Sequence, residues 1–285
     1  MSRVIAITGA ARGIGLATAT ALRAAGARIA IGDIDGEEAA RAGAELGSDV
    51  LTASLDVTDH GSFKDFLALV DRELGPLDVL INNAGIMPIG PMLDEPDEVA
   101  RRVFDINVGG VLMGMKLALP GMIGRGNGHI INVSSVAGKS PVPGGASYAA
   151  SKAAVFSLTE SARVEFAGKG LHFTCVMPSF TSTELIAGTK GTRFIGNVEP
   201  SAVADAIAAA VAKPRPDVFV PAAVGAIVRS QPLIGRRLRD RINHLIGADR
   251  TFLDFDRGAR SAYDTQISRR VKAESERVGD DVPAR

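Results

Sequence analysis

The stretch Val4-Ile5-Ala6-Ile7-Thr8-Gly9-Ala10-Ala11-Arg12-Gly13-Ile14-Gly15 decides the fold class. Its first five residues are an apolar run typical of a buried parallel strand. Glycine at positions 9, 13 and 15 lets the backbone turn tightly, and the N-terminus of the following helix supplies N–H donors and a partial positive charge. The stretch therefore predicts a strand, a diphosphate-binding turn that includes Arg12 and Ile14, and a helix.

Outward from this turn, short apolar runs alternate with stretches of helical periodicity. The expected strands are Val4–Thr8, Arg28–Ile31, Val50–Ala53, Val79–Ile81, His129–Val133, Phe173–Met177 and Val218–Val220. The expected helices are Ile14–Ala25, Glu37–Leu46, Ser62–Glu73, Asp97–Leu119, Tyr148–Ala167 and Ala202–Ala212. This order is typical of an α/β fold with a Rossmann-type, doubly wound parallel sheet of about seven strands and helices on both faces. The C-terminal ends of the strands then share one edge, where a ligand crevice forms.

Composition bounds the class of protein. The 285 residues are 46% hydrophobic, enough for one domain with a full core, and 32 basic residues balance 32 acidic ones, which argues against a nucleic-acid partner. One cysteine, Cys175, and four scattered histidines offer neither a disulfide nor zinc-ligand spacing, so we expect no metal. No signal peptide or transmembrane run is apparent, and the expected location is cytoplasmic.

We expect two parts along the chain. Residues 1–221 form the dinucleotide-binding and catalytic domain, and residues 222–285 form a helical extension that is first basic and then mixed in charge. The basic part contains Arg229, Arg236, Arg237, Arg239 and Arg241. Contact with an anionic membrane surface is one interpretation, but a solvated helix face or a subunit contact is favoured because Asp240 interrupts the charge.

Asp33 ends the second expected strand, 18 residues after Gly15. An acidic side chain there can accept hydrogen bonds from the adenosine ribose hydroxyls and would repel a 2′-phosphate, which favours NAD(H) over NADP(H). Arg12 is the complication, because a basic side chain in the turn could hold that phosphate. Asp33 could also be only a turn residue, although Asp35 suits that purpose better.

Two further segments are expected at the cofactor. Asp56 and Val57 follow the third strand and could meet the adenine ring, although the neighbouring Thr58 and Asp59 could simply cap the next helix. Asn83, Ala84 and Gly85 follow the fourth strand, where small residues let the backbone lie against a nucleotide. The asparagine amides could equally tie neighbouring strands together.

The chemistry is expected at Tyr148 and Lys152, which are four residues apart and so share one face of a helix. A tyrosine has a reference pKa of about 10, and a nearby cation favours the phenolate. Ser135, at the end of another strand, can orient a substrate oxygen, with Ser134 as its competitor. Asn107 lies beside Gly109-Gly110, where a break in the helix could free a carbonyl for a water that reaches Lys152.

As an ordered set, the glycine turn, Asp33, Asp56, Asn82–Gly85, Asn107, Ser135, Tyr148-x-x-x-Lys152 and Pro178 resemble the short-chain dehydrogenase/reductase family over about Ser2 to Pro221. The resemblance implies that Tyr148 transfers the proton, that Lys152 lowers its pKa and holds the nicotinamide ribose, and that Ser135 and Asn107 assist. Pro178, Thr181 and Thr183 are then cofactor contacts. Ser179 and Thr181 depart from the family pattern Pro-Gly-x-Val-x-Thr, because they stand where the family has glycine and valine.

The sequence thus predicts an NAD(H)-dependent oxidoreductase that acts on a small-molecule secondary alcohol or ketone. The alternatives are an NADP(H)-dependent carbonyl reductase and a non-catalytic dinucleotide sensor that acts through its tail. Expected pocket segments are Ile86–Met92, Val136–Gly145 and Thr183–Val198, whose few charges are Lys139, Glu184, Lys190 and Arg193, which favours an apolar substrate. Family resemblance also implies a homodimer or homotetramer, with the helices Asp97–Leu119 and Tyr148–Ala167 as candidate interfaces.

Overall fold

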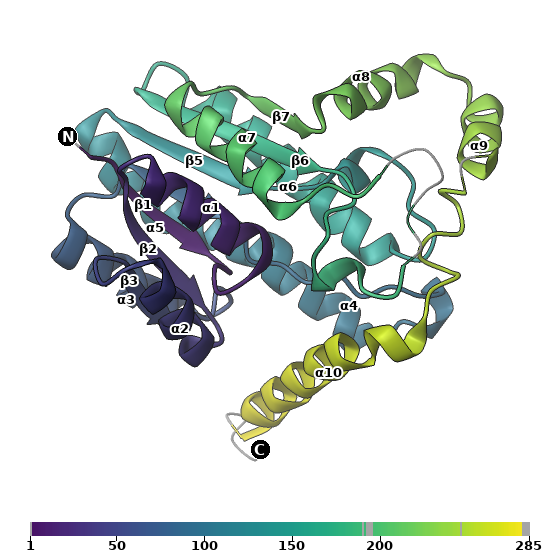
Figure 1. Ribbon diagram of the computed structural model, residues 1–285, viewed down its shortest axis with the longest axis horizontal. Helices are drawn as coiled ribbons and strands as arrows, with labels where there is room; N and C mark the ends of the chain where they lie inside the picture. Colours follow the sequence, from purple (N-terminus) through teal and green to yellow (C-terminus); the bar gives the residue numbers. More distant parts are fainter. Residues whose placement is uncertain (1, 190, 192–195, 246, 281–285) are drawn as a thin grey trace, which may run out of the picture.

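The sheet has seven parallel strands in the order β3-β2-β1-β4-β5-β6-β7 (Figure 1). The computed structural model describes residues 2–189, 191, 196–245 and 247–280. The strands are β1 (Val4–Thr8), β2 (Arg28–Asp33), β3 (Leu51–Ser54), β4 (Val79–Asn82), β5 (Gly128–Val133), β6 (Leu171–Pro178) and β7 (Asp217–Val220). The order reverses between β1 and β4, which places the expected crevice above these two strands. The predicted doubly wound sheet is confirmed.

Helices cover both faces of the sheet. They are α1 (Gly13–Ala24), α2 (Gly36–Leu46), α3 (His60–Leu74), α4 (Asp97–Phe104), α5 (Val111–Arg125), α6 (Ala146–Glu165), α7 (Pro200–Ala212), α8 (Ala222–Ser230), α9 (Arg236–Leu245) and α10 (Arg257–Asp280). Short helical turns are η1 (Met92–Asp94), η3 (Val136–Lys139), η4 (Glu184–Ile186) and η5 (Gln231–Leu233). Helices α1, α2 and α7 pack on one face, and α3, α5 and α6 pack on the other.

Alternation along β1 explains the two layers. Val4 and Ala6 join the core with α3 and α5, whereas Ile5 and Ile7 join the core with α1 and α7. Both faces of the strand are therefore buried, which is why Val4 to Ile7 are all apolar. Cys175 in β6 is a free, fully buried side chain, and burial raises the pKa of its thiol to about 12, which makes it a packing residue.

The predicted helix Asp97–Leu119 consists of three segments. A π-helical segment, η2 (Asp105–Gly110), joins α4 to α5, so the local irregularity expected near Asn107 is present. The helix also runs past its predicted end to Arg125, with Pro120 inside it. Proline has no N–H, so Pro120 cannot donate the usual helical hydrogen bond to the carbonyl of Lys116. Both residues are exposed, so water can donate to that carbonyl instead. Asp97–Arg125 has the length and hydropathy of a membrane span, but it packs on α3 and β5 in the core.

The extension after Pro221 is helical, as expected, and returns to the main body. Figure 1 shows α8 and α9 reaching outward beyond β7, and α10 coming back beneath α4. Contacts between α8 and β7 and between α10 and α4 attach the two ends of this excursion. Residues 246 and 281–285 of the predicted extension lie outside the described residues.

Candidate active site

A cavity of about 600 Å³ lies at the C-terminal edge of the sheet. Nearly all the residues that the sequence predicts for the site line it: Gly9, Arg12, Gly13, Ile14, Asp33, Asp56, Val57, Asn83, Ala84, Gly85, Ser135, Tyr148, Lys152, Pro178, Thr181 and Thr183. Gly15 and Asn107 lie behind this wall and support it. The topology therefore brings together residues that are scattered over 175 positions of the sequence, because each follows a strand whose end reaches the same edge.

The glycine turn is closely packed against the segment after β4. Gly9 has a positive φ of 63°, and a Cβ there would lie 2.7 Å from the Cα of Ala84. A Cβ on Gly15 would lie 2.4 Å from the carbonyl oxygen of Gly9. The Asn83 side chain donates to the carbonyls of Thr8 and Gly9, at 3.0 and 2.8 Å. The turn is thus fixed with its backbone open toward the cavity.

Asp33 is buried at the end of β2 and contacts the same turn. One carboxylate oxygen accepts a hydrogen bond from Ala11 N and the other from Asp35 N, each at 3.1 Å. Asp35 caps helix α2 by accepting from Glu38 N, as expected of the better turn residue. Arg12 pairs with Asp35 at 3.0 Å and with Glu184 at 3.4 Å, so two carboxylates occupy its guanidinium.

The segment after β3 makes local hydrogen bonds that shape the turn into α3, and it also lines the cavity. Asp56 accepts from the backbone and hydroxyl of Thr58, at 2.9 and 2.7 Å, and Asp59 caps α3 by accepting from Ser62 N. Asp56 and Val57 nevertheless line the cavity. Beside them is the buried Arg102 of α4, which donates to Thr58 at 3.1 Å and which the sequence reasoning missed, since nothing in its local pattern distinguishes it.

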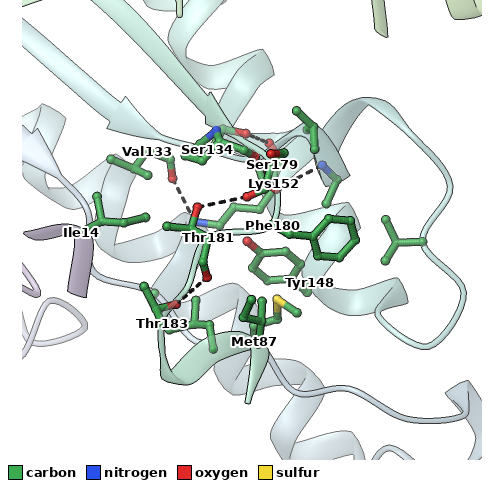
Figure 2. Close-up of a pocket in the computed structure, with 18 of the residues that line it drawn as sticks. Ile14, Met87, Val133, Ser134, Tyr148, Lys152, Ser179, Phe180, Thr181 and Thr183 are labelled. Carbon is green, nitrogen blue, oxygen red and sulfur yellow. Dashed lines mark hydrogen bonds between the residues drawn. The ribbon is translucent and has the colours of Figure 1, made fainter. Parts of the chain in front are cut away.

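Tyr148 and Lys152 project from α6 into the cavity, as Figure 2 shows. The Lys152 ammonium lies 5.7 Å from the Tyr148 ring centroid and donates to the Val133 carbonyl at 2.9 Å. Burial raises the pKa of Tyr148 to about 12, partly offset by a hydrogen bond with Ser135, and burial lowers the pKa of Lys152 to about 8. Burial and the Ser135 hydrogen bond account for the shift of the Tyr148 pKa in this structure, and the expected effect of Lys152 on that pKa stays a prediction.

Ser134 and Ser135 directly follow β5, and their hydroxyls bind different partners. Ser134 donates to the Lys152 carbonyl at 2.7 Å and so anchors helix α6. The Ser135 hydroxyl accepts from Ala137 N at 3.1 Å and reaches Tyr148. Both serines line the cavity, but Ser135 is the one whose hydroxyl reaches Tyr148.

Asn107 is completely buried in the π-helical segment. Its side chain accepts from Ile86 N at 2.9 Å and donates to Ile86 O and to the Ser151 hydroxyl, both at 3.0 Å. It thereby fixes the segment after β4 to helix α6. Through these contacts Asn107 positions the backbone of Ile86 relative to helix α6. Its expected link to a proton-relaying water stays a prediction.

The segment after β6 carries the departures from the family pattern. Thr181 donates to Ser179 O, and Thr183 donates to Thr181 O, at 3.1 and 3.3 Å. Phe180 packs against Phe252 of the extension, with ring centroids 5.5 Å apart. The Ser179 hydroxyl is buried at the cavity wall and has no hydrogen-bond partner among the described residues. An unpaired polar atom and a glycine turn too tight for side chains both fit a bound dinucleotide.

The predicted pocket segments contribute in part. Ile86, Met87, Val136–Ala137, Ser140–Val142 and Thr183–Ile186 line the cavity, whereas Lys139 lies over the Phe156 ring, and Lys190 and Arg193 lie outside the described residues. Sequence reasoning missed the contribution of the extension. Its lining residues are Val224, Ile227, Val228, Gln231, Ile234, Arg239, Ile242, Asn243, Ala248, Phe252 and Gln266. The apolar run just after Pro221 could have indicated that the extension lines the cavity.

Known proteins resemble this chain in sequence. A family model described as short chain dehydrogenase matches residues 3–192. Cis-4-hydroxycyclohexanecarboxylate dehydrogenase of Sinomonas cyclohexanicum is 42% identical over 65% of this chain and 76% of its own length. Glycine betaine reductase ATRR of Emericella nidulans is 37% identical over 65% of this chain, which spans only 15% of that longer protein.

Solved structures resemble the fold. A short chain dehydrogenase/reductase from Burkholderia phymatum in complex with NAD has a TM-score of 0.73 and 27% identity, over 80% of this chain and 92% of that one. An alcohol dehydrogenase from the archaeon Thermococcus sibiricus complexed with 5-hydroxy-NADP has a TM-score of 0.70 and 25% identity, over 77% of this chain and 96% of that one. The residues after 192, including the whole extension, lie beyond the family match. Fold, cavity and these similarities agree: the chain belongs to the short-chain dehydrogenase family and is an oxidoreductase that acts on CH–OH or C=O groups.

Proposed function

We propose that this protein uses NAD(H) to interconvert a bulky, apolar secondary alcohol and its ketone, with Tyr148 as the general acid and base. The main support for this proposal is a single cavity. The glycine turn and Asp33 line one side of it, and Ser135, Tyr148 and Lys152 line the other. NAD(H), when bound, supplies or accepts the hydride. The chain supplies binding, orientation and the proton.

The proton chemistry follows from burial. With a pKa of about 12, the Tyr148 phenol is protonated at neutral pH, which is the form that gives a proton to a ketone oxygen. Ser135 lies within reach of the same hydroxyl and can hold the substrate oxygen beside it. Alcohol oxidation needs the phenolate, so its rate should rise with pH, whereas ketone reduction needs the phenol.

The preference for NAD(H) rests on Asp33 and Arg12. Asp33 is fixed by two backbone N–H groups, so it cannot easily turn away from a 2′-phosphate placed at the end of β2. Arg12, the side chain that could have neutralised such a phosphate, is held by Asp35 and Glu184. Exposed ion pairs are weak, so NADP(H) remains the alternative to be measured.

The substrate class rests on the wall opposite the nucleotide turn. Met87, Val142, Phe180, Leu185 and Phe252 are apolar and surround the access to Tyr148. Such a wall favours bulky apolar alcohols and ketones through burial of apolar surface. A panel of secondary alcohols tests this, and a preference for small charged hydroxy acids would contradict it.

The first experiment is titration of the purified protein with NADH and NADPH, followed by the fluorescence of the reduced nicotinamide, with Tyr148→Phe in parallel. We expect both proteins to bind NADH more tightly than NADPH, and only the wild type to turn over substrate. Tighter NADPH binding would replace NAD(H) by NADP(H). Binding of NADH without turnover on a broad carbonyl panel would favour a nucleotide sensor.

We also infer a cytoplasmic homodimer or homotetramer that pairs through α4, α5 and α6. Large apolar side chains are exposed on these helices: Phe104 at 42%, Ile123 at 38% and Val164 at 65%. Light scattering that gives the mass of a monomer would refute the assembly.

A further inference from the structure

Helix α10 carries a buried arginine that the proposed reaction does not use. The side chain of Arg260 is 0% exposed, and it is the largest fully buried side chain among the described residues. Charged side chains are rarely buried unless every charge is paired or hydrogen-bonded. Arg260 lies beyond the residues that match the family, so the feature belongs to the extension of this chain.

The guanidinium joins two segments of the cavity wall. One terminal nitrogen of Arg260 donates to the carbonyl of Leu185 at 2.8 Å, and the other donates to the carbonyl of Met87. The Nε donates to Asp264 at 3.0 Å, which pairs the charge within the helix. Met87 follows β4 and Leu185 follows β6, so one side chain bridges the ends of two strands.

Tyr263, on the same helix, completes the contact. The backbone N–H of Met87 donates to the Tyr263 hydroxyl at 3.0 Å, and the Arg260 guanidinium lies 4.9 Å from the Tyr263 ring centroid. Burial raises the pKa of Tyr263 to about 12, so its hydroxyl is neutral at physiological pH. Both backbone polar groups of Met87 are therefore held by α10.

These contacts reach Tyr148 through packing. Met87 packs with Tyr148 and Phe252 in one buried cluster, and Leu185 packs against the same cluster. Figure 2 shows Met87 beside the Tyr148 ring. The position of Met87 thus decides how much room a substrate has next to the Tyr148 hydroxyl.

We propose that Arg260 and Tyr263 are positioning residues that hold Met87 and Leu185 against Tyr148 and so set the enzyme's selectivity for bulky apolar alcohols. The guanidinium is suited to this task because its planar fork binds two carbonyls at fixed angles, which a lysine cannot do. The kinetic part of this inference rests on the proposed function. The structural part, that α10 fixes the Met87 backbone, does not.

The kinetic test compares Arg260→Lys and Tyr263→Phe with Arg257→Lys, a control at an exposed position of the same helix. NADH dissociation constants, kcat and KM are measured for a bulky and a small secondary alcohol. We expect NADH binding to change less than twofold, and KM for the bulky alcohol to rise about ten- to one-hundredfold in Arg260→Lys, with a smaller loss of kcat. Tyr263→Phe, which keeps the ring packing, should shift KM in the same direction, and the control should not.

An unchanged ratio of kcat/KM between the bulky and the small alcohol in both variants would overturn the proposal. A parallel loss of NADH binding would also overturn it, because that result means a general loss of structure. Should Arg260→Lys fail to fold, Tyr263→Phe still decides between these outcomes.

Amide hydrogen exchange tests the structural part without substrate. In Tyr263→Phe the Met87 N–H loses its acceptor, so its exchange should accelerate roughly two- to tenfold, the range expected for one hydrogen bond. Amides of the glycine turn should exchange as in the wild type. An unchanged Met87 amide would refute the contact. Faster exchange in a protein that turns over no alcohol or ketone would support the contact and refute the proposed function.

Discussion

Replacing Lys152 by methionine should make the protein more stable at neutral pH while it abolishes turnover. Burial lowers the pKa of the Lys152 ammonium from 10.5 to about 8. At roughly 1.4 kcal/mol per pH unit, this difference corresponds to about 3 kcal/mol of folding free energy that the wild type loses at pH 7 by keeping the charge buried. Methionine has a similar length and carries no charge.

An opposing effect comes from the Val133 carbonyl. It accepts a hydrogen bond from Lys152 at 2.9 Å, and leaving it unpaired costs about 1–3 kcal/mol. At pH 7 we therefore expect Lys152→Met to be more stable than the wild type by roughly 0–2 kcal/mol.

The pH dependence of the stability difference tests the buried ammonium more directly than its value at pH 7. Because the folded-state pKa of Lys152 is below the unfolded one, the unfolded wild type binds more protons, and wild-type stability rises as pH increases from about 8 to 10.5. The variant has no such gain. Its stability relative to the wild type should fall by roughly 2–3 kcal/mol between pH 7 and pH 10. Tyr148, whose pKa is raised to about 12, is present in both proteins, so its contribution cancels.

Urea unfolding followed by far-UV circular dichroism measures this difference, since the chain has no tryptophan to report by fluorescence. The exposed Lys116→Met controls for the loss of one positive charge. If the stability difference between Lys152→Met and the wild type is the same at pH 7 and pH 10, the buried ammonium does not carry the cost assigned to it. Full turnover by the variant would refute its catalytic involvement.

Three further outcomes are expected. Ser135→Ala should lower kcat about 100-fold with little change in stability, whereas Ser134→Ala should cost about 1 kcal/mol of stability and leave kcat nearly unchanged; the reverse pattern would exchange their roles. Asp33→Asn should reduce the preference for NADH over NADPH at least about tenfold in fluorescence titrations, since one like charge near the phosphate is removed, and an unchanged ratio would locate the selectivity elsewhere. Asn107→Ala leaves both backbone polar groups of Ile86 unpaired and should lower stability by about 2–4 kcal/mol in denaturant melts; a loss under about 0.5 kcal/mol would contradict this.

Local sequence patterns were sufficient to predict the nucleotide turn and the pairing of Tyr148 with Lys152. The apolar run before Gly9 and the four-residue spacing of Tyr148 and Lys152 depend only on strand and helix periodicity, so both could be predicted from the sequence. The rules of strand connection then place their ends at one edge.

Other features depend on contacts between distant residues. Nothing in the local pattern around Arg260 indicates that it is buried against Met87, 173 positions earlier in the chain. The helix that was predicted to end at Leu119 continues to Arg125, because the exposed Pro120 is tolerated inside it. The direction of the Lys152 ammonium, toward the Val133 carbonyl, also follows from tertiary packing and could not be read from spacing.

The bridge from α10 to Met87 also has a consequence for biosynthesis. Chains leave the ribosome N-terminus first, and folding begins with what has already emerged. The nucleotide turn, Asp33 and Tyr148 can therefore fold before α10 is synthesised. At that stage the Met87 carbonyl still lacks its hydrogen bond from Arg260 in α10. A nascent chain halted before α10 would expose the apolar side chains around Met87 and Tyr148. We expect chaperones to bind such a chain, although it can already bind NADH.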